Sequence, residues 1–230
     1  MKERLSKLLQ LISLKVLFSV VSFLVVLYIF AAVAHEIFLE REDELDQNVF
    51  QFLDSYATQE IIEVMRFFTF FGKPQFLIPA YVFMIILFLV KKKRNYAIEI
   101  GIIGATSTVL LFGLKKFFQR ERPHIPIFDH LPGYSFPSGH ALLSFVFVSA
   151  LIYLLWRSEL SHAWKWTLSL LLILFSFMVG ISRIFLRVHY ATDVIAGFCL
   201  GYAWVILSLW VQRRFINKRK LQQFTHDPSD

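Results

Sequence analysis

The residues best suited to chemistry lie in the segment 182–193, between two long apolar runs of the sequence. The segment holds two arginines, a histidine and an aspartate. His189 and Asp193 are four residues apart, so a helix would place them one turn apart on one face, where a carboxylate can orient and polarise an imidazole. Polar residues at the edge of a membrane-length apolar run are costly and indicate a functional site. The pair alone also fits a solvated helix end or a structural His–Asp pair.

A second polar segment, Phe136-Pro137-Ser138-Gly139-His140, directly precedes another apolar run. Because Pro interrupts a helix and Ser is a preferred N-cap residue, the segment predicts a helix that begins here. A helix start offers free backbone N–H groups and the positive end of the helix dipole, which together bind phosphate oxygens. Gly139 would let those oxygens approach the backbone closely. His140 would then lie in the first turn, beside a bound anion.

The elements that must position these residues are membrane-spanning helices. Hydrophobic residues make up 57% of the 230 positions, phenylalanine supplies 26 of them, and charged residues make up only 18%, against about a quarter in an average protein. This composition excludes an ordinary water-soluble domain and predicts an integral membrane protein. Cys199, the single cysteine, lies within an apolar run, so neither a disulfide framework nor a cysteine-based metal site is expected.

Six apolar runs are expected to cross the membrane, and the first is long enough to span a hydrocarbon core of about 30 Å. They are residues 16–34, 74–90, 96–114, 141–156, 164–181 and 194–211. The expected fold class is therefore all-α, a polytopic bundle of six transmembrane helices. The first run also resembles a cleavable signal peptide that ends in Ala32-Val33-Ala34, but it exceeds the usual signal core of about 7–15 residues, which favours an uncleaved anchor.

The expected single domain, residues 1–230, divides into four parts. These are the first span (1–35), an acidic segment (36–73), a five-span catalytic core (74–212) and a basic tail (213–230). In the later part of the acidic segment, apolar residues recur at helical spacing, which predicts short interfacial amphipathic helices after the first span. A small soluble cap is the alternative.

The basic residues between the spans predict the orientation of the chain. Six spans place both termini on the same side, and the basic clusters at the amino terminus, at 91–94, around Arg157 and in the tail fall on that side. The positive-inside rule assigns this side to the cytoplasm of a cell membrane, which we expect to be bacterial. The acidic segment and both polar segments described above then face outward.

Six basic residues face outward against this rule. They are Lys115, Lys116, Arg120, Arg122, Arg183 and Arg187. Several guanidinium and ammonium groups that converge on one site match the charge and geometry of a phosphate. A patch for anionic lipid headgroups is the alternative explanation.

Three motifs in these outer segments resemble the tripartite signature of the type-2 phosphatidic acid phosphatase superfamily. They are Lys115-x6-Arg122-Pro123, Pro137-Ser138-Gly139-His140 and Ser182-Arg183-x5-His189-x3-Asp193, and they match the signature at each motif position. The resemblance covers residues 70–210. In layout the chain is most similar to bacterial six-span lipid phosphatases, which include phosphatidylglycerophosphatases and undecaprenyl-pyrophosphate phosphatases.

The resemblance implies hydrolysis of the terminal phosphate of a membrane lipid phosphate or pyrophosphate, of the phosphatidylglycerophosphate, undecaprenyl pyrophosphate or phosphatidate class. His189 would be the nucleophile that forms a phosphohistidine, Asp193 would orient it, and His140 would protonate the leaving oxygen. The phosphate-binding residues would be Lys115, Arg122, Ser138, Gly139 and Arg183. They would stabilise the transition state by neutralising its charge, without a metal ion or another cofactor.

Arg120 and Arg187 lie outside the motifs and are interpreted as peripheral. The expected partners are the lipid phosphate substrate, drawn from the outer leaflet, and the surrounding membrane lipids. The sequence indicates neither nucleic-acid binding nor an obligate protein partner.

Other chemistries fit the sequence less well. A Ser138-His189-Asp193 hydrolase triad lacks a Gly-x-Ser-x-Gly elbow and has no use for several cations. A metal site formed by His140, His189 and Asp193 would place a divalent cation beside lysines and arginines that repel it. The main non-enzyme alternative is a membrane transporter or channel with an outer-face anion site, although no repeated half is evident. A haloperoxidase that binds vanadate shares the anion site, but six spans favour a lipid substrate.

Overall fold

The structure is a computed structural model, which describes the backbone of residues 2–41, 43–124, 127 and 132–225. Among these residues, it also describes the side chains of residues 14 to 212 and of Arg214. Throughout this described part the ordered elements are helices, and no strand is formed. The expected all-α class is therefore confirmed. The basic side chains expected at the amino terminus, and those of the expected tail apart from Arg214, lie outside the described residues.

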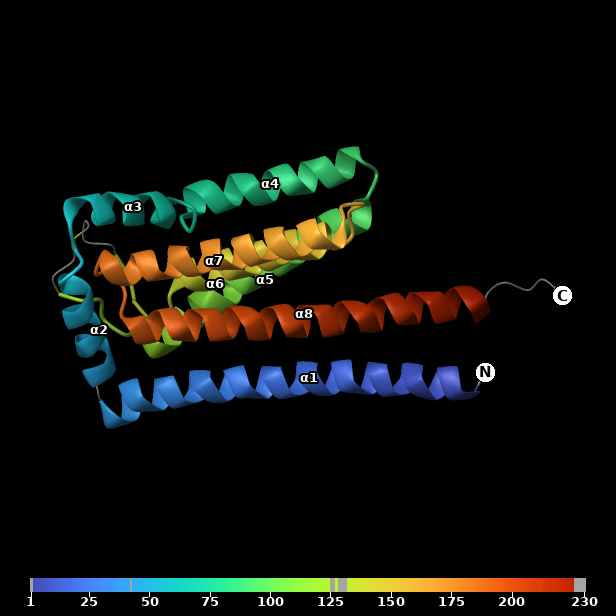
Figure 1. Ribbon diagram of the computed structural model, residues 1–230, viewed down its shortest axis with the longest axis horizontal. Coiled ribbons are helices and arrows are strands. Elements are labelled where there is room, and N and C mark those ends of the chain that lie inside the picture. The colour runs from blue at the N-terminus through green and yellow to red at the C-terminus, as the bar shows by residue number, and fades with distance from the viewer. Residues whose placement is uncertain (1, 42, 125–126, 128–131, 226–230) are drawn as a thin grey trace.

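The helices of the described chain run along one axis, apart from one that lies crosswise (Figure 1). They are α1 (Lys2–His35), continued by a π-helical turn η1 (Glu36–Glu40), α2 (Glu44–Asp54), α3 (Gln59–Phe70), α4 (Pro74–Val90), α5 (Arg94–Phe118), α6 (Gly139–Leu155), α7 (His162–Phe185) and α8 (Ala191–Thr225). α2 crosses one end of the bundle, and the loops between α5 and α6 and between α7 and α8 lie at the same end (Figure 1).

In the described chain, five stretches are long and apolar enough to cross a membrane, and α6 adds a shorter apolar helix. The five are Leu14–Glu40, Gln59–Val90, Arg94–Phe118, His162–Phe185 and Ala191–Gln212. Large apolar side chains on these helices face outward, with Phe18 73% exposed and Val109 72% exposed. Lipid chains cover such surfaces in a bilayer, where a helix satisfies its own backbone hydrogen bonds. The chain is a multi-pass membrane protein.

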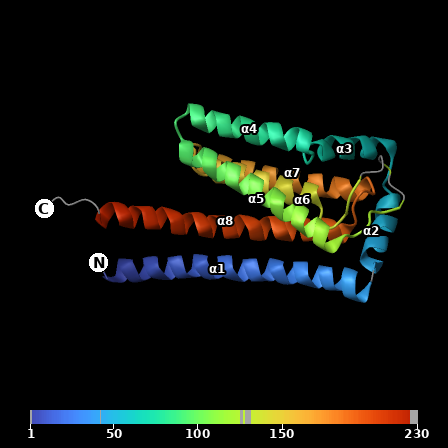
Figure 2. The same ribbon diagram turned by 180° about the vertical axis from the view of Figure 1, so that it is seen from behind.

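α6 is the central helix of the bundle. It packs against α5, α7 and α8, and its buried side chains include Leu142 and Val146. Seen from the side opposite to Figure 1, α5 lies in front of α6 and α7 (Figure 2). With 17 residues α6 is about 25 Å long. The six expected crossings thus correspond to α1, α3 with α4, α5, α6, α7 and α8, of which α6 is the shortest.

The second crossing differs from the expected one because α3 extends it. α3 and α4 lie end to end (Figure 1) and together form the apolar stretch Gln59–Val90. α3 packs along α7, and its Met65 is buried in a cluster with Leu186 and Val188. Of the two amphipathic helices that follow the first span, α2 crosses the bundle end, as an interfacial helix would, whereas α3 lies in line with a spanning helix.

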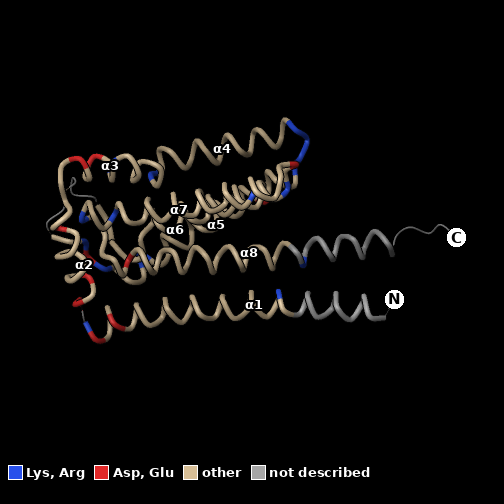
Figure 3. The backbone as a smooth tube through the Cα atoms, viewed as in Figure 1, with Lys and Arg blue, Asp and Glu red and all other residues tan. Residues whose placement is uncertain are grey.

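Charged residues divide between the two ends of the bundle (Figure 3). The acidic residues of α2 and of the start of α3 lie at one end (Figure 3). The basic residues 91–94 form the turn between α4 and α5 at the other end, where α1 begins and α8 ends. The two polar segments singled out in the sequence therefore lie at the acidic end, away from this basic turn.

Two glycines of α8 allow a close approach of α8 to α6. A Cβ atom on Gly197 would lie 2.7 Å from the backbone oxygen of Ser138, and one on Gly201 would lie 3.2 Å from the backbone oxygen of Leu142. This close contact explains why the pair of small residues is spaced four apart on α8. It brings the start of α6 against the first turns of α8.

Candidate active site

The loop between α7 and α8 positions the expected catalytic pair. Its Val188 and His189 backbone N–H groups both donate to the carbonyl oxygen of Arg183, at 3.1 and 3.2 Å. These hydrogen bonds fold the loop over the end of α7, and Arg187 takes a left-handed backbone with φ 51° within it. The loop thereby places His189 beside the first turn of α8, which carries Asp193.

His189 and Asp193 are in contact, as expected from their spacing, but His189 lies in the loop before α8 and not on the same helix as Asp193. Nδ1 of His189 lies 3.2 Å from Oδ2 of Asp193, which also accepts from the backbone N–H of Tyr190 at 3.0 Å. Both side chains are buried, at 2% and 0% exposure. Because a carboxylate accepts a hydrogen bond, this contact places the imidazole proton on Nδ1. Nε2 is then unprotonated, and it accepts a hydrogen bond from the Arg122 guanidinium at 3.3 Å.

The surroundings of His189 favour the neutral imidazole. Burial lowers the pKa of His189 well below its usual value, and the charges of Arg183, Lys115 and Arg122 lower that pKa further. A neutral imidazole whose Nε2 is unprotonated is the form that can act as a nucleophile.

The second polar segment starts a helix, as its sequence predicts. The Ser138 side chain accepts a hydrogen bond from the backbone N–H of Ala141 at 3.5 Å, so Ser138 is the N-cap of α6. Gly139 also has a packing role, because a Cβ atom there would lie 2.9 Å from the Leu111 side chain of α5. His140 follows in the first turn, and its Nε2 is buried without a hydrogen-bond partner among the described residues.

Three expected phosphate-binding cations lie around the pair. Arg122 donates to the backbone oxygens of Gly133 and Val188, at 3.1 and 2.8 Å. Lys115 donates to two consecutive backbone oxygens of the α5–α6 loop, those of Tyr134 and Ser135. Burial lowers the pKa of the Arg122 guanidinium, although Asp193 partly offsets this effect. The loop therefore holds both cations through carbonyl oxygens, which leaves their charges available to an anion.

Arg183 is the most deeply buried of these cations, with 2% of its surface exposed. One of its terminal nitrogens donates to the hydroxyl of Thr69, at the end of α3. Its Nε has no hydrogen-bond partner among the described residues, as is also true of Nε2 of His140. Buried polar groups are normally paired, so two unpaired groups in one site indicate where a ligand would bind. The structure thus brings together the residues that the three motifs single out.

Arg120 was interpreted from the sequence as peripheral, and the structure corrects this. It donates from one terminal nitrogen to Oδ1 of Asp193 at 2.8 Å and from the other to Oδ2 of Asp46 at 2.8 Å. Burial alone would lower the pKa of Arg120, but these two carboxylates outweigh burial and raise that pKa. Arg187, by contrast, pairs with the exposed Asp54 of α2. Only the position of Arg120 between Lys115 and Arg122 could have indicated its role.

The turn between α3 and α4 also contributes to the site, which the sequence did not indicate. A Cβ atom on Gly72 would lie 2.4 Å from Cδ2 of His140 and 2.8 Å from Cγ1 of Val179. The turn therefore packs directly against the His140 ring. Together with the contact of Thr69, this explains why α3 lies along α7 rather than on the membrane surface.

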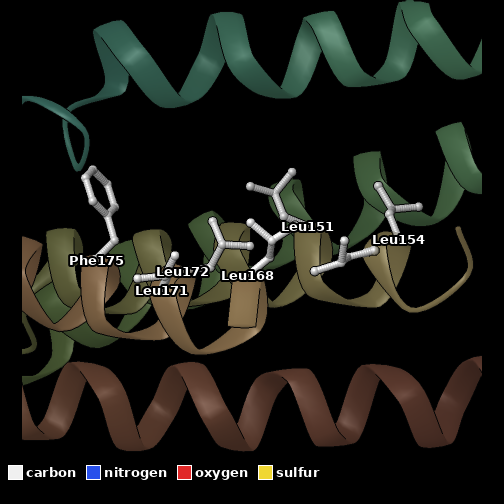
Figure 4. A pocket seen from close by; sticks show the side chains of 7 residues that line it. Leu151, Leu154, Leu168, Leu171, Leu172 and Phe175 are labelled. Carbon is white, nitrogen blue, oxygen red and sulfur yellow. The ribbon is translucent and has the colours of Figure 1, made fainter. Parts of the chain in front are cut away.

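An apolar cavity of 580 Å³ lies apart from these polar residues. Its lining residues are Leu151, Leu154, Leu155, Leu168, Leu171, Leu172 and Phe175. Figure 4 shows their side chains along α6 and α7, on the side that faces α4. The cavity holds no charged side chain and lies within the membrane-spanning part of the bundle.

The arrangement around His189 suits the transfer of a phosphoryl group. A neutral imidazole can attack phosphorus, a second imidazole can exchange a proton with an oxygen, and three cations can neutralise the phosphate oxygens. Such a site at one end of a helical membrane bundle is typical of a membrane phosphatase.

Comparisons with known proteins agree with this class. Residues 94–217 match the PAP2 superfamily, and the chain belongs to that family of phosphatases. The chain is 31% identical over 141 residues to phosphatidylglycerophosphatase B of Bacillus subtilis, covering 60% of this chain and 69% of that protein. It is 27% identical over 181 residues to an undecaprenyl-diphosphatase of Sulfolobus acidocaldarius, covering 75% of this chain and 81% of that protein.

A solved structure supports the same assignment at the level of the fold. The crystal structure of a transmembrane PAP2-type phosphatidylglycerolphosphate phosphatase from Bacillus subtilis superposes with a TM-score of 0.77. The superposition covers 84% of this chain and 96% of that one, at 25% sequence identity. The resemblance seen in the three motifs thus extends to the arrangement of helices over 84% of this chain.

Proposed function

We propose that this protein hydrolyses the terminal phosphate of a membrane lipid phosphate or pyrophosphate through a phosphohistidine on His189. The observation that carries the proposal is the environment of the His189 ring. Its Nδ1 lies against Asp193, while its Nε2 faces Arg122 at 3.3 Å. A nucleophilic nitrogen that faces a guanidinium is well placed to meet the phosphorus of a phosphate that this guanidinium binds.

In the first step, the Nε2 lone pair of His189 attacks phosphorus, and the bond between phosphorus and the lipid oxygen breaks. His140 enters this step as the imidazolium, a form that the negative charge of a bound phosphate favours, and gives its proton to the leaving oxygen. Its buried Nε2 has no partner within the described structure. The imidazole ring gains positive charge as the N–P bond forms, and Asp193 stabilises it through Nδ1–H. Lys115, Arg122 and Arg183 stabilise the equatorial phosphoryl oxygens.

In the second step, a water molecule attacks the phosphorus of the phosphohistidine. His140, now neutral, takes a proton from this water, and the N–P bond breaks as its electron pair returns to Nε2 of His189. Inorganic phosphate is released, and both histidines recover their initial protonation states. The same imidazole thus acts as an acid in one step and as a base in the other.

We propose that neither step requires a metal ion. The three cations supply the charge that a divalent ion supplies in other phosphoryl-transfer enzymes. Those cations would also repel a divalent ion from the same place. Ser138 and Gly139 support the anion from the start of α6, where free N–H groups and the helix dipole favour negative charge.

The names of the relatives support a lipid substrate of the phosphatidylglycerophosphate or undecaprenyl pyrophosphate class. Purified protein in detergent should release inorganic phosphate from at least one lipid in a panel of phosphatidate, phosphatidylglycerophosphate and undecaprenyl pyrophosphate. His189→Ala should release none. If the wild-type protein is inactive on the whole panel, or if His189→Ala is as active as the wild type, the proposal fails.

We also propose that the chain is one catalytic domain with both termini in the cytoplasm and the site on the outer face of a cell membrane, where it takes substrate from the outer leaflet. The basic turn 91–94 and the acidic α2 lie at opposite ends of the bundle, which supports this orientation. Reporter fusions at Lys93 and at Glu44 should report opposite sides of the membrane. A report of the same side from both fusions would contradict the orientation.

A further inference from the structure

A network of buried side chains connects α2 to the catalytic pair. Asp46 of α2 accepts at Oδ1 from the backbone N–H of Thr192, at 2.9 Å. At Oδ2 it accepts from the Thr192 hydroxyl at 2.6 Å and from Arg120 at 2.8 Å. Arg120 in turn donates to the Thr192 hydroxyl and to Asp193, both at 2.8 Å. The network therefore runs without a break from α2 through Arg120 to the carboxylate beside His189.

Each carboxylate in this network depends on Arg120. Asp46 is 1% exposed and Asp193 is 0% exposed. A buried carboxylate is strongly destabilising unless its charge is paired and its oxygens accept hydrogen bonds. The forked guanidinium provides one nitrogen to each of them, which a lysine with a single ammonium group cannot reproduce.

The network also fixes the rotation of the Asp193 carboxylate. Its Oδ2 faces His189 and the N–H of Tyr190, while its Oδ1 faces Arg120. Because a carboxylate is planar, contacts at both oxygens hold it in one orientation. Arg120 is held in turn by Asp46 and by the ring of Tyr190, whose centroid lies 4.0 Å from the guanidinium carbon.

We infer that Asp46 and Arg120 are positioning residues that fix the orientation of Asp193 and, through it, the tautomer and direction of the His189 ring. The inference rests on the proposed phosphoryl transfer to His189 and adds two residues to the machinery of that reaction. It also gives the acidic segment a function, because α2 then supplies the outermost carboxylate of the active site. Without Asp46, Arg120 would lose one of its two carboxylate partners and one of the contacts that direct it toward Asp193.

A second ion pair between α2 and the α7–α8 loop provides the matched control. Asp54 of α2 pairs with Arg187, but the carboxylate of Asp54 is 53% exposed, and within the described part of the chain it makes no hydrogen bond to His189 or Asp193. Asp54→Asn removes a charge from the same helix and weakens the same attachment of α2. If the Asp46 network only held α2 in place, Asp46→Asn and Asp54→Asn would affect catalysis alike.

The first measurement is the nitrogen NMR spectrum of the full-length protein labelled with ¹⁵N-histidine, in detergent. The signals of His189 are assigned by their loss in His189→Asn. Wild-type protein and Asp54→Asn should show His189 with its proton on Nδ1. Asp46→Asn and Arg120→Gln should show a mixture of tautomers. This readout requires no substrate, so it decides the role of the network even if the protein hydrolyses none of the lipids tested.

The second measurement is the rate of hydrolysis of dioctanoyl phosphatidate. A small displacement of a reacting group can lower a rate by about 100-fold, so we expect a kcat about 10- to 100-fold lower in Asp46→Asn and Arg120→Gln, with KM within about twofold of wild type. Asp54→Asn should keep both constants. Arg120→Lys, which keeps the charge but not the fork, should be intermediate and provides a measurement if Arg120→Gln does not fold.

The outcomes separate the two proposals. A wild-type protein that is inactive on the lipid panel contradicts the proposed function, whereas an altered His189 tautomer in Asp46→Asn still supports the positioning role. An unchanged tautomer in Asp46→Asn overturns the positioning role, whatever the rate. A kcat that falls equally in Asp46→Asn and Asp54→Asn overturns it as well, since the loss would then come from a displaced α2.

Discussion

The backbone N–H of Ser138 donates to the backbone oxygen of Asp193 over 2.9 Å. This main-chain hydrogen bond joins the start of α6 to the first turn of α8. It therefore joins the helix start that would bind phosphate to the helix that carries the partner of the nucleophile. Because the bond involves no side chain, its geometry depends on how closely the two helices pack.

Gly197→Ala should separate these two helices. The added Cβ would lie 2.7 Å from the Ser138 oxygen and 3.0 Å from Cβ of Ala141, and a backbone oxygen cannot move aside as a flexible side chain can. Overpacking of this kind typically costs about 1–3 kcal/mol. We expect a lower thermal unfolding midpoint in detergent and a lower kcat.

Gly113→Ala is the matched control for this variant. Gly113 also lies within a helix, but nothing lies within 4 Å of the position of its added Cβ. Replacement of a helical glycine by alanine at such a position should stabilise the protein by about 0.4–1 kcal/mol. Equal unfolding midpoints for the two variants would show that the contact between α6 and α8 is not tight.

His140→Ala should affect substrates according to their leaving groups. General acid catalysis is typically worth about 10²–10⁴-fold, and an alkoxide leaving group needs a proton far more than a phosphate leaving group does. In single-turnover experiments, phosphorylation by phosphatidate should therefore slow more than phosphorylation by a prenyl pyrophosphate. An equal slowing for both substrates would mean that His140 is not the acid.

Gly72→Ala should reproduce part of this effect without removal of the imidazole. The new Cβ would lie 2.4 Å from Cδ2 of His140, so the ring must move. We expect a selective loss of activity on phosphatidate, smaller than the loss in His140→Ala. The ratio of the hydrolysis rates on phosphatidate and on a prenyl pyrophosphate measures this selectivity. A ratio equal to that of the wild type would show that the contact of Gly72 with His140 does not affect proton donation to the leaving group.

Chelation should leave activity nearly unchanged, whereas vanadate should inhibit it. If the three cations stabilise the phosphoryl oxygens, hydrolysis should persist in EDTA at a rate within about twofold of the untreated enzyme. Vanadate should inhibit, because it forms a trigonal-bipyramidal adduct with a nucleophile such as Nε2 of His189 and thereby resembles the transferring phosphoryl group. Complete loss of activity in EDTA, restored by added magnesium, would refute the proposed role of the cations.

The sequence predicted the parts of this structure that depend on local patterns. The lengths of the apolar runs identified the membrane-spanning helices, and the four-residue spacing of His189 and Asp193 identified their contact. The N-cap preference of Ser138 identified the start of α6. Each of these predictions concerns residues that are close together in the sequence, so no knowledge of tertiary packing was needed. His189 itself lies in the loop before α8 and not on the helix that carries Asp193.

The remaining features depend on contacts between distant segments. Asp46 meets Thr192 across 146 positions of the chain, and Arg183 meets Thr69 across 114. No periodicity in a single sequence reports such a pairing. For the same reason α3 was expected at the membrane surface: its helical spacing of apolar residues is visible in the sequence, but its contact with α7 is not.

The measurement that tests the account most directly is the capture of the phosphorylated enzyme. Protein mixed with ³²P-labelled phosphatidate is quenched in alkali within a single turnover, because a phosphohistidine is stable in alkali and labile in acid. We expect label on the protein that is lost in acid, that maps to the peptide containing His189, and that is absent from His189→Ala. Turnover without label on the protein, or label on a peptide that lacks His189, would contradict it.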